Sequence, residues 1–112
     1  TMIRENWNLN NYQAQAKDTA IYPEAAKIVY TALGLAGEAG EVADKVKKII
    51  RDGRDDTAFK NEIAREIGDV LWYCALLADD LGYTLQQIAE MNISKLKSRM
   101  ASGNIQGSGD NR

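Results

Sequence analysis

The scarcity of proline is the feature that most constrains how this chain can fold. The sequence contains a single proline, Pro23, and most of its nine glycines fall between predicted elements or in the C-terminal tail. Long stretches are therefore free of helix breakers. Apolar residues recur within them at the three-to-four-residue spacing of a helix with one buried face. The sequence predicts an all-α fold.

Four helices are expected, over residues 10–20, 24–51, 57–81 and 84–100. Pro23 is well placed at the start of the second helix, and Gly82 is a good C-terminal stop for the third. Thr84, with Gln87 three residues later, resembles the capping box that opens a helix. The apolar stripe expected along the second helix consists of Ile28, Leu35, Val42, Val46 and Ile49.

Length and composition predict one small domain over residues 2–100. A chain of 112 residues buries only part of its surface, so a four-helix bundle completed by oligomerisation, as a homodimer or homotetramer, is expected. Residues 101–112 are rich in Gly, Ser and Asn, and form either a flexible tail or a flap over the site that carries Arg112. Thr1 precedes Met2 and is interpreted as a cloning remnant.

Several classes of protein are disfavoured by what the sequence lacks. A net charge of −2 gives no reason to expect binding to a nucleic acid polymer, and no apolar run is long enough to span a membrane. The absence of histidine argues against a di-iron site and against a Ser/His or Cys/His nucleophile. The lone Cys74 is expected to be a core thiol, which fits a cytoplasmic location.

Two acidic pairs carry the strongest functional signal. Glu38 and Glu41 are three residues apart within one predicted helix, and Glu66 and Asp69 within the next, with 24 residues between the pairs. Residues i and i+3 share a helix face, so each pair presents two carboxylates side by side. A chain reversal at Asp52-Gly53 would bring the pairs together.

Four clustered carboxylates repel one another unless a cation neutralises them. Hard oxygen ligands without histidine or thiolate suit Mg²⁺, with Mn²⁺ as a substitute. We therefore expect Glu38, Glu41, Glu66 and Asp69 to bind metal. The glycines at positions 34, 37 and 40 weaken the second helix, and either close helix contact or room for a ligand would explain them.

The sequences Gly37-Glu-Ala-Gly-Glu-Val-Ala-Asp44 and Glu66-Ile-Gly-Asp69-Val-Leu-Trp72 resemble those of the MazG-like nucleoside triphosphate pyrophosphohydrolases, a family similar to the dimeric dUTPases. The family motif is E-x-x-E followed, after a variable spacer, by E-x-x-D. The stretch Asn92-Ile-Ser-Lys95-Leu-Lys-Ser-Arg99 also matches the family's N-x-x-K-x-x-x-R stretch. The resemblance implies an α-helical dimer or tetramer that uses Mg²⁺ to cleave nucleotides to a monophosphate and pyrophosphate.

The resemblance also implies roles for individual residues. Glu38 or Glu41 would act as general base, and Lys95 and Arg99 would grip the substrate phosphates, although a solvated basic face is the simpler interpretation. Lys45 and Lys48 lie near the face of Glu41 and contact either phosphate or neighbouring acids. Glu62, one turn before Glu66, is interpreted as a surface charge.

Aromatic and amide side chains are the candidates for contact with the base or sugar. They comprise aromatic residues that could stack on a base and amides that could read its edge, namely Trp7, Tyr12, Trp72, Tyr73, Gln13 and Asn92. Aromatic residues at helical spacing are more often part of the core, and Trp72 lies in an apolar run.

The predicted function is therefore Mg²⁺-dependent hydrolysis of (deoxy)nucleoside triphosphates, for removal of non-standard or surplus nucleotides. One alternative is a dUTPase-like or dCTP-directed hydrolase of the same superfamily. Another is a non-catalytic helical protein that binds a cation or a partner through its acidic face.

Overall fold

The computed structural model describes residues 6–54 and 57–103, and every regular element in this part of the chain is helical. The elements are α1 (Leu9–Asp18), a short 3-10 helix η1 (Glu24–Ala26), α2 (Val29–Asp52), α3 (Ala58–Asp80) and α4 (Leu85–Ser102). The all-α class is confirmed, and the order of the four α-helices agrees with the prediction. Most of the tail, including the proposed flap, lies outside the described residues.

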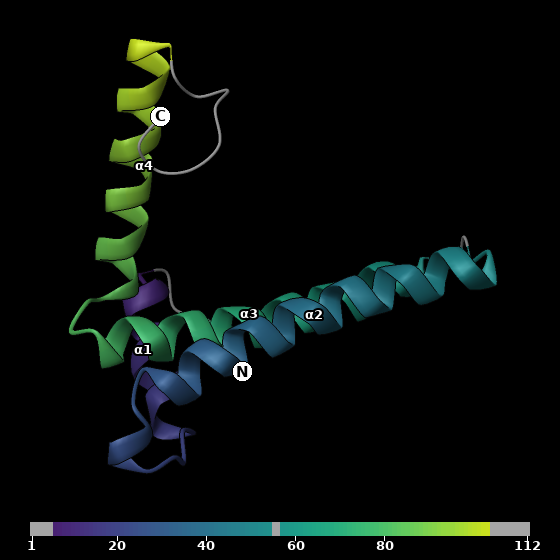
Figure 1. Cartoon of the computed structure of the whole chain (residues 1–112), viewed down its shortest axis with the longest axis horizontal. Coiled ribbons are helices and arrows are strands. Elements are labelled where there is room, and N and C mark those ends of the chain that lie inside the picture. Colours follow the sequence, from purple (N-terminus) through teal and green to yellow (C-terminus); the bar gives the residue numbers. More distant parts are fainter. Residues whose placement is uncertain (1–5, 55–56, 104–112) are drawn as a thin grey trace.

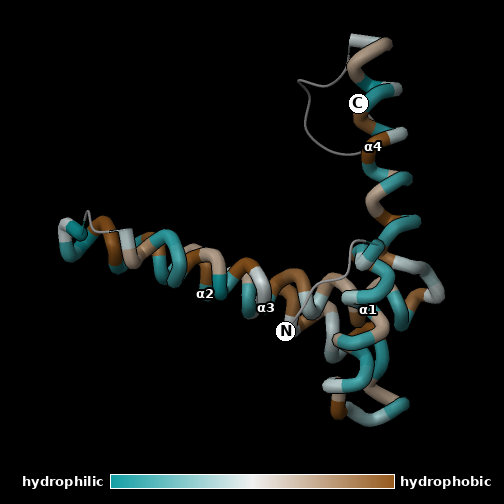
Figure 2. The backbone as a smooth tube through the Cα atoms, turned by 180° about the vertical axis from the view of Figure 1, so that it is seen from behind, coloured by the Kyte–Doolittle hydropathy of each residue, from teal (hydrophilic) through white to brown (hydrophobic). Residues whose placement is uncertain are grey.

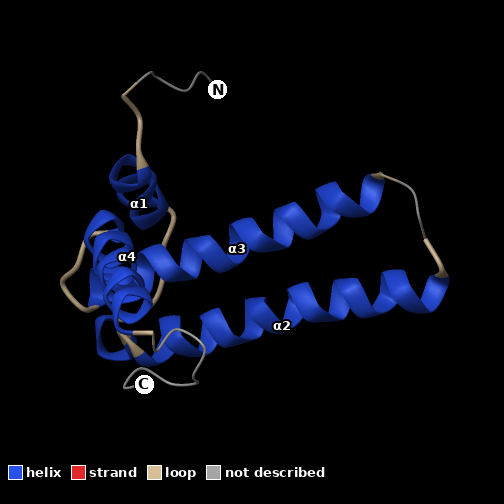
Figure 3. Cartoon of the chain, turned by 90° about the horizontal axis from the view of Figure 1, so that it is seen from above, coloured by secondary structure: helices blue, strands red, loops and turns tan. Residues whose placement is uncertain are grey.

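The helices α2 and α3 form a long antiparallel hairpin. Gly53 adopts a left-handed conformation at φ +65° and ends α2, as the Asp52-Gly53 reversal predicted. Figure 1 shows the two helices side by side over their whole length, and Figure 3 shows α1 and α4 gathered at the opposite end from the turn. We call this end the base of the hairpin.

The predicted start of the second helix at Glu24 is wrong. Residues 24–26 form a single 3-10 turn, and the α-helix begins only at Val29. Between them Ile28 has a φ of +71°, which is a rare conformation for a β-branched residue. The apolar spacing continues across this break, so the sequence predicted one uninterrupted helix from Glu24. A local change in backbone direction does not alter the spacing of apolar residues.

A carboxylate from α3 holds this break in place. Asp80 accepts hydrogen bonds from the backbone N–H of Ile28 at 2.9 Å, the Thr31 hydroxyl at 2.9 Å and the Tyr22 hydroxyl at 2.8 Å. Thr31 is fully buried. Strained backbone persists where the surroundings determine it, so Asp80 fixes the direction in which α2 leaves the base.

The core is small and sits at the base of the hairpin. Its buried members are Ala16, Ala75, Leu76 and Leu85, with Tyr12, Tyr22, Leu71, Trp72 and Cys74 packed around them. The placement of Cys74 confirms the expected core thiol, and burial raises the pKa of its side chain. The core therefore joins α1, α3 and the start of α4. Among the described helices, α2 and α3 pack mainly on each other in the half of the hairpin nearer the turn.

The last helix, α4, begins at the capping box predicted for Thr84 and Gln87. It leaves the base steeply and points away from the hairpin (Figure 1). Hydrophobic segments recur along α4 beyond its contacts with the base (Figure 2). The four helices therefore do not close into a bundle within one chain, and completion by another chain remains a prediction.

Candidate active site

Three of the four predicted metal-binding carboxylates come together across the hairpin. One oxygen from each of Glu38, Glu66 and Asp69 lies within 4.8 Å of the others. The helices bring them together because Glu66 and Asp69 share a face of α3, and the antiparallel register sets Glu38 of α2 opposite them. The predicted meeting of the two acidic motifs is therefore seen for these three residues.

The fourth carboxylate, Glu41, is exposed and is not a member of this group of three. It lies one turn further along α2, and its charge still acts on the cluster. Partial burial, followed by the charges of Asp69, Glu66 and Glu41, raises the pKa of Glu38. Like charges at short range disfavour ionisation, so the cluster has the electrostatics of a site that gains from a cation.

The donor set of the cluster fits a hard divalent cation. Carboxylate oxygens from Glu38, Glu66 and Asp69 are the ligands that Mg²⁺ prefers, and Mg²⁺ keeps several positions for water and phosphate oxygens. No soft ligand that would favour zinc or copper belongs to this group. The residues present therefore suit the metal that the sequence predicted.

Basic side chains surround the cluster on the side of the hairpin turn. Lys45 and Arg65 line a hollow of about 330 Å³ together with Glu62, Glu66 and Asp69. Glu62 pairs with Arg54 at 2.7 Å and more loosely with Lys45 at 3.8 Å. Glu62 is thus more than an isolated surface charge, because it links the two helices beside the carboxylates.

The other predicted phosphate ligands lie elsewhere in the chain. Lys48 pairs with Asp44 at 2.9 Å, as the simpler interpretation expected. Lys95 and Arg99 are on the second half of α4, which points away from the hairpin, and Arg99 is buried (Figure 1). Within one chain the structure therefore does not bring the Lys95/Arg99 pair to the carboxylates. The spacing of the two residues predicts that they share a face of a helix, but it does not predict the direction of that helix.

Tyr73 lies on the base side of the cluster, one turn after Asp69. Its ring occupies the space where a side chain at position 34 would start, since a Cβ on Gly34 would lie 2.5 Å from Tyr73 Cζ. A Cβ at Gly37 or Gly40 would meet nothing within 4 Å. Close contact therefore explains Gly34, whereas it does not explain the other two glycines.

Tyr73 and Tyr12 both lie near the acidic cluster. Partial burial, a hydrogen bond with Tyr30 and the charges of Glu38 and Asp69 raise the pKa of Tyr73. Burial and then the charge of Asp69 raise the pKa of Tyr12, which α1 supplies. Trp7 packs edge-on against Tyr12 with ring centroids 6.4 Å apart.

Two residues that were predicted to contact the base, Gln13 and Trp72, instead make contacts within the protein. Gln13 is buried, and its amide bonds the backbone of Ala75, Tyr83 and Leu85 at 3.0 to 3.1 Å. The predicted contact of Gln13 with a base is therefore wrong: its side chain links α1 to α3 and to the start of α4. Trp72 packs against the core and donates to the Thr19 hydroxyl at 2.9 Å.

The last candidate, Asn92, lies on α4 in a shallow hollow with Ile88, Met91 and Lys95. Like Lys95, it belongs to the helix that leaves the hairpin.

Two residues were not predicted from the sequence: Arg65, which lines the hollow beside the cluster, and Tyr30, which contacts Tyr73. Arg65 carried no motif signal, and only its neighbourhood to Glu66 could have suggested it. Tyr30 lies 6.4 Å from Tyr73 between ring centroids and stacks on Tyr22 at 5.1 Å. Tyr30, Gly34 and Glu38 are spaced four residues apart and therefore lie on one face of α2. This spacing is present in the sequence and could have indicated Tyr30.

The fold and the carboxylate cluster define the class: an all-α protein in which acidic residues of two antiparallel helices form a cluster that could hold a metal ion. A family model for the MazG nucleotide pyrophosphohydrolase domain matches residues 29–102, which include α2, α3 and α4. The chain belongs to this family. It is also similar to the Gene 37 protein of Mycobacterium phage L5, at 48% identity over 109 residues, covering 90% of this chain and 96% of that protein. The search of solved structures returned no significant match.

Proposed function

We propose that the protein uses Mg²⁺ to hydrolyse (deoxy)nucleoside triphosphates to nucleoside monophosphate and pyrophosphate, and so removes unwanted nucleotides from the cellular pool. The observation that carries this proposal is the gathering of Glu38, Glu66 and Asp69 within 4.8 Å on a domain of the MazG nucleotide pyrophosphohydrolase family. Membership of the family supports nucleotide pyrophosphohydrolysis in general, and the donor set supports the choice of metal.

In this proposal Glu38, Glu66 and Asp69 hold the cation, with Glu41 completing its surroundings. When bound, Mg²⁺ neutralises phosphate oxygens and acidifies a water molecule. Glu41 is exposed beside the cluster and is a candidate to accept the proton of the attacking water, as is Glu38. Lys45 faces the same hollow and would stabilise charge on the phosphates.

The reaction is tested by incubating the purified protein with the four NTPs and four dNTPs separately, with Mg²⁺ and with EDTA. We expect monophosphate and pyrophosphate in equal amounts, only when Mg²⁺ is present. The ranking of the bases separates broad house-cleaning from a dUTPase-like or dCTP-directed enzyme, for which dUTP is added to the panel. If none of these nucleotides is cleaved while Mg²⁺ still raises the melting temperature, a non-catalytic cation-binding protein is the better description.

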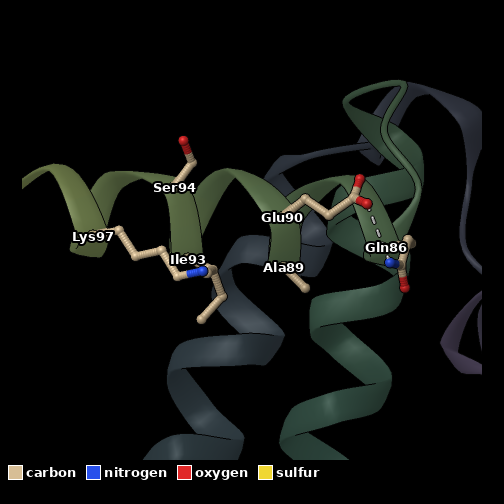
Figure 4. Close-up of a pocket in the computed structure, with 6 residues that line it drawn as sticks. All are labelled: Gln86, Ala89, Glu90, Ile93, Ser94 and Lys97. Atoms are coloured by element: carbon tan, nitrogen blue, oxygen red, sulfur yellow. Dashed lines mark hydrogen bonds between the residues drawn. The ribbon is translucent and has the colours of Figure 1, made fainter.

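We further propose that the protein is a homodimer or homotetramer. Apolar side chains stay exposed on one face of α4, among them Ile93 at 50% and Met100 at 69%, which are seven residues apart. In Figure 4, Ala89 and Ile93 project from one side of α4, and Ser94 from the other, around a hollow of about 470 Å³. An apolar helix face of this extent is more often an interface than free surface.

Sedimentation velocity tests the assembly. We expect a dimer or tetramer at micromolar concentration, and we expect Ile93→Lys to shift the protein toward monomer because it places a charge on the exposed apolar face. Ser98→Lys, at an exposed position of α4 outside this hollow, is the matched control and should leave the assembly unchanged. A wild-type monomer at these concentrations would contradict the proposal.

None of the helices in the described ranges combines the length and apolar character needed to cross a membrane. A cytoplasmic location remains our proposal, in keeping with nucleotide substrates and a free, partly buried thiol at Cys74.

A further inference from the structure

We propose that Glu62 is a positioning residue for the metal site. Its carboxylate holds the ammonium group of Lys45 outside the carboxylate cluster, so that Lys45 does not compete with the cation for the clustered oxygens. This inference rests on the cation site of the proposed function. It gives Glu62, which lies outside both acidic motifs, a role that acts through Lys45.

One hollow contains both metal-binding carboxylates and a cationic side chain that could compete for them. Lys45, Glu66 and Asp69 line the same space of about 330 Å³, together with Glu62. The ammonium group of a lysine is a compact charge on a flexible stem, so it can pair with any carboxylate within its reach. Lys45 is therefore a competitor, built into the site, for the ligands of a bound cation.

The ammonium group of Lys45 lies on Glu62 rather than on the cluster. Its Nζ is 3.8 Å from Oε1 of Glu62, and within residues 6–54 and 57–103 no ion pair joins Lys45 to Glu66 or Asp69. Glu62 is one helical turn before Glu66 on α3 and is not a member of the clustered three. Glu62 therefore gives Lys45 a partner that leaves the clustered oxygens available to a metal ion.

Arg54 holds the Glu62 carboxylate in this position. Its guanidinium group lies 2.7 Å from Oε2 of Glu62, whereas Lys45 pairs with Oε1. The two oxygens thus serve different partners, and neither partner has to leave for the other to bind. Ion pairs with hydrogen-bond geometry at so short a distance are among the stronger polar contacts. Because Arg54 directly follows Gly53, this anchor comes from the turn end of the hairpin.

Loss of the Glu62 carboxylate would release Lys45 toward the cluster. The other acids that line the hollow are Glu66 and Asp69. An ammonium group paired with either of them would occupy an oxygen that a divalent cation needs, and it would place a like charge beside that cation. We therefore expect cation binding to weaken when Glu62 is neutralised, and we expect this loss to depend on Lys45.

Binding of Mn²⁺ alone tests this role without depending on turnover. The ion is titrated into the protein, and free Mn²⁺ is followed by electron paramagnetic resonance. We expect Glu62→Gln to weaken Mn²⁺ binding about threefold to fivefold, the size expected for a partly exposed ion pair. In a Lys45→Met background the same change should weaken binding less than about twofold, because the competing ammonium group is absent.

Arg54→Gln is the matched control. It removes the shorter ion pair of Glu62 but keeps the carboxylate that holds Lys45, so Mn²⁺ binding should stay within about twofold of wild type. If Glu62 acted only by tying the hairpin turn together, Arg54→Gln would weaken binding as much as Glu62→Gln. The Glu62 side chain is 34% exposed, so its substitution opens no core, and circular dichroism checks the helix content of each variant.

Equal weakening by Glu62→Gln in the wild-type and Lys45→Met backgrounds would overturn the inference, because it would indicate a direct effect of the Glu62 charge. Unchanged binding in Glu62→Gln, or equal weakening by Arg54→Gln, would overturn it as well. These results would leave the metal site in place, whereas a wild-type protein that binds no Mn²⁺ would reject that site and the proposed function. The expected pattern in a protein that cleaves no nucleotide would uphold the role of Glu62 and reject the proposed hydrolysis.

Discussion

Replacing Asp69 with asparagine is expected to reduce the rate of nucleotide hydrolysis by about 100-fold or more, because a cation held by carboxylates supplies several kcal/mol of charge stabilisation. Asp69 is one of the three clustered carboxylates and is exposed on α3, so the change removes a ligand without opening the core. The measurement is the initial rate of pyrophosphate release with saturating Mg²⁺.

The fold of the variant should survive. Of the neighbouring charges, that of Asp69 contributes most to the raised pKa of Glu38, so its loss relieves repulsion in the metal-free protein. We expect the melting temperature of Asp69→Asn in EDTA to equal or exceed that of wild type, while the rise on adding Mg²⁺ disappears.

Asp79→Asn makes the same chemical change on the same helix, outside the cluster, and is the control. It removes a surface ion pair with Lys17 at 3.4 Å and should retain both turnover and the response to Mg²⁺. Unchanged turnover in Asp69→Asn would reject the assignment of the metal site.

Asp80→Ala should have the largest effect on stability, about 2–4 kcal/mol at pH 7, because it removes three hydrogen bonds to a carboxylate and leaves the buried Thr31 hydroxyl without this partner. The strained Ile28 would also lose the contact that fixes it. Urea unfolding followed by circular dichroism gives the difference. Asp79→Ala, at the neighbouring position, should cost less than about 1 kcal/mol.

The effect of Asp80→Ala has a defined pH dependence. Partial burial alone would raise the pKa of Asp80, but the hydrogen bonds from Ile28, Tyr22 and Thr31 together lower it. A carboxyl group with a lowered pKa stabilises the fold fully above its unfolded pKa of about 3.9, and this stabilisation is lost as the pH falls through the lower folded value. The two proteins should therefore converge in stability below about pH 4. A constant difference down to pH 2 would contradict this account.

The sequence was sufficient to predict those parts of the fold that depend on local pattern. The capping box at Thr84, the stop at Gly82 and the reversal at Gly53 are local signals, and the structure contains all three. The meeting of Glu38 with Glu66 and Asp69 followed from the antiparallel hairpin that the reversal creates.

Features that depend on tertiary packing were not predictable in the same way. The break at Ile28 is held by Asp80, 52 residues away, so no local pattern marks it. The direction of α4 follows from packing at the base, and for this reason the helical spacing of Lys95 and Arg99 did not place them. For Gly34 the sequence left two explanations open, close helix contact or room for a ligand. The contact of Gly34 with the ring of Tyr73 supports close helix contact.

The reversal at Gly53 also bears on how the chain can vary. All clustered carboxylates are carried by helices, and the link between α2 and α3 lies beyond them at the far end of the hairpin. The helical repeat of each arm, rather than the link, sets the spacing of the oxygens. Residues can therefore be added to or removed from this link without moving the acidic groups, which gives a physical reason for a motif whose two halves are constant and whose spacer is not.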